Sequence, residues 1–223
     1  MTGDPDLHET LRWENGVGWI AHPDERMQRA STALVDGDDV WVIDPVDAPG
    51  LDDLLAEFGD VAGVVVGLDR HFRDADTVAS RHDVAVHAPS WMSGVREEVN
   101  APIERFDSYL ADTDIRAIRV RDSSVPPWQE VALYREADGT LVVPEAVGAG
   151  TFFLVDPERL GVHPALRLFP PRQALGSLSP KRVLTGHGGG VEDRATEALR
   201  DALAGSRTRA PKLYAKLFRE LVL

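Results

Sequence analysis

The chain has 223 residues, of which 43% are hydrophobic, and this size and composition suit one domain, 1–223, with a substantial core. It carries 37 acidic and 24 basic residues, so its net charge is −13 and it lacks the positive surface that binding to a nucleic-acid backbone requires. It has no cysteine, which excludes disulfides and thiolate metal sites and leaves His, Asp and Glu as candidate metal ligands.

No apolar run reaches the roughly 18 residues of a membrane span, and the beginning MTGDPDLHET is acidic where a secretory signal is basic. We therefore expect a soluble, cytoplasmic protein that does not act at a membrane. The basic residues are almost all arginine, with lysine only at Lys181, Lys212 and Lys216. An acidic, lysine-poor surface fits a halophilic source, although a GC-rich genome also favours arginine over lysine.

The first half of the chain alternates strand and helix patterns. A hairpin is expected around Gly37-Asp38, with its second strand ending at Asp44-Pro45. Apolar residues at helical spacing follow in 50–59, and the alternation then continues. The expected elements are a helix over 50–59, a strand over 61–69, a helix over 73–83 and a strand over 84–89. This β-α-β-α-β order is typical of a sheet covered by helices.

The second half contains more strands. Strands are expected over 116–120, 130–136, 139–146 and 181–186. A helix is expected over 172–179, and two further helices close the chain.

Polar residues stand where several of these strands end. Asp44, Glu145 and His187 each follow an apolar strand, and the stretch LDRHFRDA, residues 68–75, follows another. Ligands of α/β folds gather at such strand ends. We therefore expect Asp69, His71, Glu145 and His187 to share one pocket.

Four segments in this order resemble the metallo-β-lactamase fold family. They are DVWVIDP (39–45), GVVVGLDRHFRDA (63–75), VALYREADGTLVVPEA (131–146) and LGSLSPKRVLTGHGGGVEDRATEALRDAL (175–203). The resemblance spans most of the chain. It implies an α/β fold, a four-layer αββα sandwich, with a site along one edge of its two sheets.

The resemblance also implies a degenerate metal site. The family motif His-x-His-x-Asp-His falls on residues 69–74, where Asp69 and Asp74 replace two of its histidines, His71 remains, and Arg73 replaces its aspartate. The family's isolated histidine falls near Pro126, which has no side-chain donor. A guanidinium cannot ligate a metal, so two ions are not expected.

The surviving positions are candidates for one divalent ion, zinc first, or for none. The candidate metal ligands are His71, His187, Glu145, Asp69 and Asp74. Asp69 and Asp74 are also candidate acid or base groups. Arg73 is expected to form a salt bridge with Asp74 or Glu145 in place of a metal charge, and Arg73 and Trp128 are candidate contacts for a small molecule. The remaining histidines, His8, His22, His82, His87 and His163, match no ligand position and are assigned to the surface or core.

Each candidate also has a purely structural interpretation. The two histidines can be satisfied by backbone groups, and the acids of 69–74 can simply begin a helix. Two functions therefore remain open. The favoured hypothesis is a metal-free or mononuclear homologue that serves as a binding or interaction domain. The alternative is a mononuclear hydrolase of a small ester, thioester or phosphoester.

Overall fold

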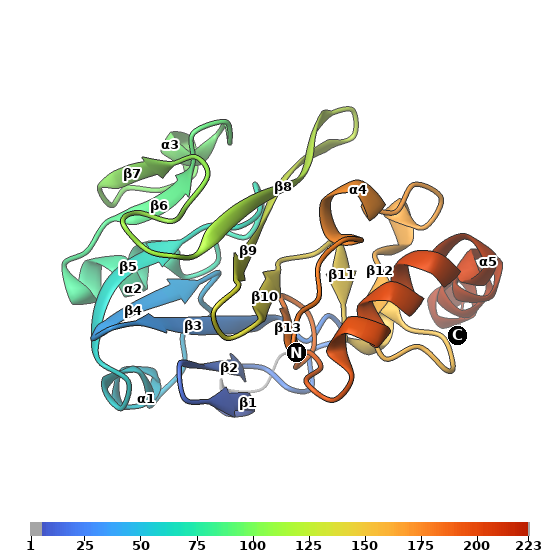
Figure 1. Ribbon diagram of the computed structural model, residues 1–223, viewed down its shortest axis with the longest axis horizontal. Helices are drawn as coiled ribbons and strands as arrows, with labels where there is room; N and C mark the ends of the chain where they lie inside the picture. Colours follow the sequence, from blue (N-terminus) through green and yellow to red (C-terminus); the bar gives the residue numbers. More distant parts are fainter. Residues whose placement is uncertain (1–5, 223) are drawn as a thin grey trace.

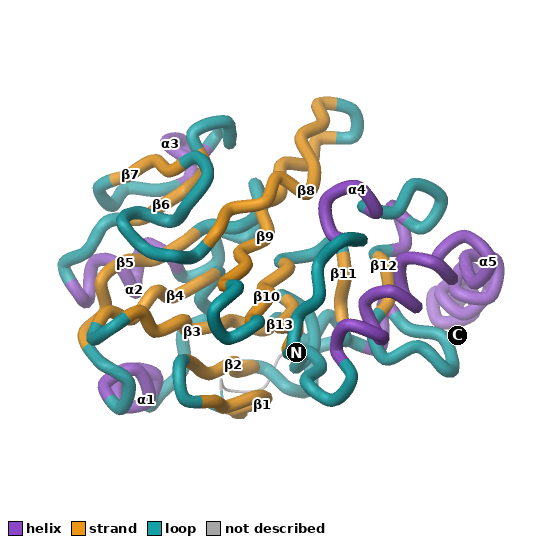
Figure 2. The backbone as a smooth tube through the Cα atoms, viewed as in Figure 1, coloured by secondary structure: helices purple, strands orange, loops and turns teal. Residues whose placement is uncertain are grey.

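The computed structural model describes residues 6–222, with side chains described to residue 220. Within this range, two β-sheets pack between two layers of helices (Figures 1 and 2). This is the four-layer αββα arrangement that the sequence predicts.

The first sheet has seven strands in chain order. They are β1 (His8–Trp13), β2 (Gly16–Ile20), β3 (Ala30–Asp36), β4 (Asp39–Ile43), β5 (Asp60–Val65), β6 (Val86–Pro89) and β7 (Ile103–Phe106). Strands β1 to β4 are antiparallel, whereas β4 to β7 are parallel and need crossover connections. Those connections contain α1 (Leu51–Ala56), α2 (Ala75–His82) and α3 (Val95–Glu98), whose apolar residues share one buried cluster with the outer face of the sheet.

The second sheet has the order β13-β10-β9-β8. Its strands are β8 (Arg116–Ser124), β9 (Pro127–Arg135), β10 (Thr140–Val143) and β13 (Arg182–Thr185). Helices α4 (Arg172–Leu175) and α5 (Ala195–Val222) belong to its outer side, together with a small sheet of β11 (Val147–Gly148) and β12 (Gly161–Val162) and two 3₁₀ turns, η1 (Thr151–Phe153) and η2 (Pro164–Leu166).

Alternation along β9 places the core on both faces of the second sheet. Val131 and Leu133 lie in the cluster between the two sheets, while Trp128, Ala132 and Tyr134 lie in the cluster beneath the helices. The sheet is therefore buried on both faces, as a four-layer fold requires.

Three features differ from the sequence prediction. Strands β1, β2 and β7 were not expected, and the glycines of β2 (GVGWI) weaken its strand pattern. Helix α4 has only four residues. One continuous helix, α5, replaces the two expected at the end of the chain and includes Pro211. A proline inside a helix costs about 3 kcal/mol, and the buried neighbours Ala210 and Leu213 offset that cost.

None of the helices in residues 6–222 combines the length and the apolar character of a membrane span, and α5, with 28 residues, has many charged side chains.

Candidate metal centre

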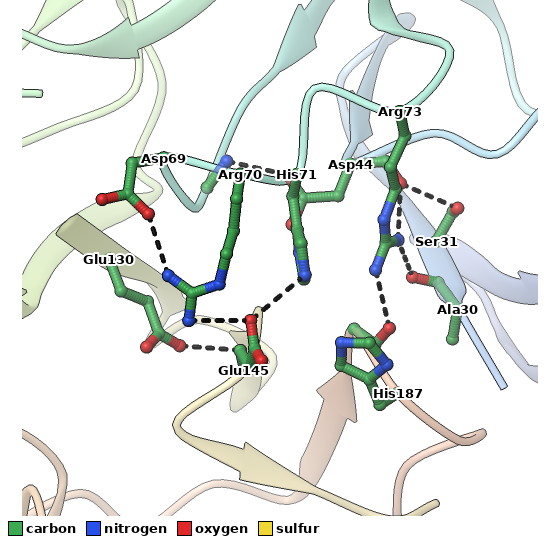
Figure 3. Close-up of polar contacts among 12 residues, drawn as sticks. Ala30, Ser31, Asp44, Asp69, Arg70, His71, Arg73, Glu130, Glu145 and His187 are labelled. Carbon is green, nitrogen blue, oxygen red and sulfur yellow. Dashed lines mark hydrogen bonds and ion pairs between the residues drawn. The ribbon is translucent and has the colours of Figure 1, made fainter. Parts of the chain in front are cut away.

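Three side chains meet where strands of the two sheets end. His71 lies in the loop between β5 and α2, Glu145 follows β10, and His187 follows β13. One ligand atom from each lies within 4.8 Å of the others (Figure 3). The three residues are 6%, 7% and 5% exposed, so their polar atoms are largely removed from water. Of the four residues expected to share a pocket, His71, Glu145 and His187 form this group, and Asp69 does not belong to it.

The ring of His71 is oriented by Asp44, which ends β4. His71 Nδ1 lies 2.9 Å from Asp44 Oδ2, and the other carboxylate oxygen accepts the backbone N–H of Gly67 at 2.7 Å. Because a carboxylate only accepts, Nδ1 carries the proton and Nε2 is directed towards the cluster. His71 Nε2 lies 3.4 Å from Glu145 Oε2. Two acceptors at this distance need a proton or a cation between them.

His187 is held in the matching way by a backbone carbonyl. Its Nδ1 donates to Met27 O at 2.9 Å, which leaves the lone pair on Nε2. That Nε2 is buried and has no hydrogen-bond partner in the described part of the chain. Burial, with the nearby positive charge of Arg73, lowers the pKa of His187 to about 3. The ring is therefore neutral at pH 7, and the lone pair of its buried Nε2 is available to a metal ion.

Glu145 is surrounded by hydrogen-bond donors. His163 Nδ1 accepts the backbone N–H of Ala165 at 3.2 Å, so the proton of a neutral His163 ring lies on Nε2, which is 3.3 Å from Glu145 Oε1. Arg70 Nη2 lies 3.1 Å from Glu145 Oε2. Burial alone would raise the pKa of Glu145, but the bonds to His163 and His71 and the charge of Arg70 hold it well below its usual range. The carboxylate is ionised at neutral pH.

A second buried acid, Glu130 on β9, fixes the backbone next to Glu145. Its Oε1 accepts the N–H groups of Glu145 and Ala146 at 2.7 and 2.8 Å, and its Oε2 accepts Trp128 Nε1–H at 2.7 Å. Burial raises the pKa of Glu130 to about 7, and these three donors oppose that rise. Glu130 thereby fixes the backbone that carries Glu145.

Arg70 lies between two carboxylates of the site. Its Nη1 lies 3.0 Å from Asp69 Oδ1 while Nη2 contacts Glu145 (Figure 3). The guanidinium also stacks 4.2 Å from the Trp128 ring centroid. Asp69 also accepts the backbone N–H of Gln129 at 2.8 Å. Both oxygens of Asp69 are thus engaged, and Asp69 is not part of the group formed by His71, Glu145 and His187.

The expected salt bridge of Arg73 is wrong. Its guanidinium donates to three backbone carbonyls, Ala30 O at 2.6 Å, Asp44 O at 2.9 Å and Gly186 O at 2.8 Å. No ion pair to Asp74 or Glu145 forms in the described part of the chain. Burial lowers the pKa of Arg73 to about 10, so it remains protonated at neutral pH. Arg73 therefore bridges the strand ends and is not free to contact a small molecule.

Two further residues lie differently from expectation. Asp74 turns away from the cluster, and its Oδ2 accepts the backbone N–H of Asp47 at 2.9 Å. Trp128, a candidate contact for a small molecule, is only 4% exposed, because it belongs to the apolar face of β9.

The sequence prediction also missed three neighbours of Glu145. His163 was assigned to the surface or core, and Arg70 and Glu130 were not considered. Glu130 had a usable signal, since an acid in the strand pattern of 130–136 faces a buried layer and needs partners. His163 follows the two-residue strand β12, which gives almost no sequence pattern.

The donors present suit one ion of the zinc type. Two neutral imidazole nitrogens and a carboxylate form a ligand set of catalytic zinc sites, with positions left for water or substrate. Asp44 and Met27 O accept the Nδ1–H groups of the two histidines, and metal-binding histidines commonly use a carboxylate or a backbone carbonyl in this way to hold the ring. A second divalent ion would lie beside the fixed charges of Arg70 and Arg73, so the set fits one ion and not two.

No protein-family model matches the chain, and no curated protein matches it. Solved structures do match. DIM-1 metallo-β-lactamase superposes with a TM-score of 0.62 at 15% identity, covering 92% of this chain and 100% of that one. A diflavin flavoprotein from Nostoc gives 0.63 at 14% identity, with coverages of 96% and 100%. The mono-zinc form of the metallo-β-lactamase FIM-1 from Pseudomonas aeruginosa gives 0.55 at 10% identity, with coverages of 92% and 97%. The chain therefore has the metallo-β-lactamase fold.

Proposed function

We propose that this protein binds one divalent metal ion, zinc in the first place, through His71, Glu145 and His187, and uses it to hydrolyse a small ester, thioester or phosphoester. The observation that carries the proposal is His187 Nε2, a buried lone pair without a partner among the described residues. Leaving such an atom unsatisfied costs about 1–3 kcal/mol, and a cation bound by all three residues would remove that cost.

A bound ion would supply Lewis-acid chemistry and lower the pKa of a coordinated water. The protein's own residues prepare the position. Asp44 and Met27 O hold the two rings with Nε2 directed inwards. The positive charge of Arg70 offsets part of the negative charge of Asp69 and Glu145. The remaining negative charge of the site is small enough for one divalent ion to offset.

A metal-free binding domain remains the second candidate because of the contacts of Glu145. His163, His71 and Arg70 already satisfy that carboxylate without an ion. In this case a proton lies between His71 and Glu145, and His187 Nε2 stays without a partner among the described residues.

Metal content separates the two functions. We would purify the protein without chelator, measure zinc, iron and manganese by elemental analysis, and titrate the metal-free protein with zinc in a chelator competition. One ion per chain, lost in His187→Ala and in Glu145→Gln, is expected. His82→Ala is the matched control, because His82 pairs with Asp52 at the surface away from the cluster.

Hydrolysis is then assayed with p-nitrophenyl acetate, p-nitrophenyl phosphate and an acyl thioester. Activity that depends on the ion and disappears in His187→Ala supports the hydrolase. Binding of one ion without turnover would refute the hydrolase and support a protein that binds a metal without catalysis. Absence of stoichiometric metal binding in the wild type would support the metal-free candidate.

A further inference from the structure

A hollow away from the metal centre lies between α4 and β8, the edge strand of the second sheet. These two elements lie side by side in Figure 1. It has a volume of about 540 Å³, within the range of about 300–1,000 Å³ typical of small-molecule sites. Its walls come from two segments, 119–121 on β8 and 166–174 around α4. None of the metal-centre residues lines it.

The charge of this hollow is opposite to that of the whole protein. Its lining contains Arg119, Arg121 and Arg172 and no acidic residue, although the chain has 37 acidic residues and a net charge of −13. A concave surface with one sign of charge concentrates ligands of the opposite sign. The hollow therefore favours an anion.

The three arginines differ in how far they are already engaged. Arg172 donates to the carbonyls of Leu203 and Ala204, and Arg119 pairs with Asp122 at 3.2 Å. Arg121 forms no ion pair within residues 6–220, and its Nε is buried without a hydrogen-bond partner. Arg121 is thus the guanidinium best placed to receive a carboxylate or phosphate, with which it can form two parallel bonds.

Apart from Gln173, the remainder of the lining is apolar, and it includes an exposed aromatic ring. Phe169 is 75% exposed, and Pro170, Pro171, Leu166 and Val120 lie beside it. A large apolar side chain that stays exposed at the rim of a concave site is a common sign of ligand binding. Flat proline and phenylalanine surfaces are suited to packing against a planar ring.

We propose that this hollow binds a small aromatic anion, with its carboxylate or phosphate on Arg121 and its ring against Phe169 and Pro170. The volume accommodates an aryl phosphate or a mononucleotide. One unpaired guanidinium serves one anionic group, and the net charge of −13 opposes a longer polyanion.

Calorimetric titration with phenyl phosphate and AMP tests the proposal, with phenol and adenosine as uncharged counterparts. We expect saturable binding of both anions with Kd values below about 1 mM and no saturation by the uncharged pair. Arg121→Gln should weaken binding by about 10-fold or more, because a hydrogen bond to a charged group is lost. Phe169→Ala should also weaken it, and since Phe169 is exposed this variant is expected to fold.

Two control variants test whether the anion binds in this hollow or elsewhere on the protein. Arg159→Gln removes an arginine from a different hollow, one that also contains Glu197 and Asp201, and should leave affinity unchanged. His187→Ala in the presence of EDTA should also bind normally, which separates this site from the metal centre. If neither anion saturates the wild type, or if Arg121→Gln and Phe169→Ala both bind as tightly as the wild type, the proposal is wrong.

Discussion

The substitution Asp44→Asn is expected to move the ring proton of His71 from Nδ1 to Nε2 and to change little else in the candidate metal centre. The Asn oxygen can keep the bond from the Gly67 N–H, which Asp44 Oδ1 accepts at 2.7 Å. Its NH₂ group would then face His71 Nδ1, where the carboxylate now accepts at 2.9 Å. Since an amide NH₂ donates, the proton of His71 must move to Nε2. The ring would donate to Glu145 and would have no lone pair for a metal ion.

The magnitude follows from these contacts. Removing an outer-shell partner of a metal-binding histidine lowers metal affinity by about 10- to 100-fold, which corresponds to about 1.4–2.7 kcal/mol of binding free energy. The apoprotein keeps its hydrogen bonds after the tautomer changes. We therefore expect its free energy of unfolding to fall by only about 1 kcal/mol, the difference between a charged and a neutral hydrogen bond.

Zinc affinity is measured by competition with a chelating indicator at pH 7.5, and the protonated ring nitrogen of His71 is identified by long-range ¹H–¹⁵N NMR. Asp47→Asn is the matched control, because Asp47 pairs with Arg81 and does not contact the cluster. If the proton moves to Nε2 and zinc affinity still stays within about threefold of the wild type, His71 is not a ligand and the reasoning fails.

Three further predictions concern stability. Arg73→Met removes one donor from each of three carbonyls, although Asp44 O keeps the Ser31 hydroxyl and Gly186 O keeps the Ala30 N–H. Urea denaturation should therefore show a loss of about 1–3 kcal/mol in the free energy of unfolding, and Arg73→Asp should be destabilised at least as much instead of gaining an ion. A loss below about 0.5 kcal/mol would contradict this bridging role. Folding lowers the pKa of His187 from 6.5 to about 3, so the unfolded chain binds a proton more readily than the folded one between these pH values. The free energy of unfolding should therefore fall as the pH drops from 6.5 towards 3. His187→Gln should flatten this dependence, and an equally steep dependence in the variant would show that His187 does not cause it. With a net charge of −13, the melting temperature should rise from low salt to molar potassium chloride if the acidic surface is a salt adaptation; a flat response would favour genome composition as the explanation.

The position of the cluster could be predicted from the sequence because strand ends are readable. Runs of apolar β-formers end at residues 44, 68 and 186, and ends of parallel strands meet at one edge of a sheet. The partner of each arginine could not be predicted in this way. Arg70 and Arg73 are three residues apart, and both long side chains can reach a carboxylate from the same loop. The positive φ of Arg73, 42°, belongs to a local turn that no residue preference indicates.

Two other errors have different physical causes. Trp128 was a candidate contact for a small molecule, yet the alternation of β9 buries it on the same face as Ala132 and Tyr134, and that pattern was visible in the sequence. His163 was missed because β12 has two residues and owes its place to pairing with β11. Short strands are specified by tertiary contacts, which spacing along the chain does not encode.

The three bonds of Arg73 also limit what a single substitution can do at this position. An acid at position 73 would add a candidate metal ligand, but the same substitution removes a donor from three carbonyls at separate strand ends. A variant designed to hold a second ion would therefore need other residues to take over those carbonyls. Arg73 thus couples the number of ions that the centre can hold to the joining of the strand ends, so a change in one alters the other.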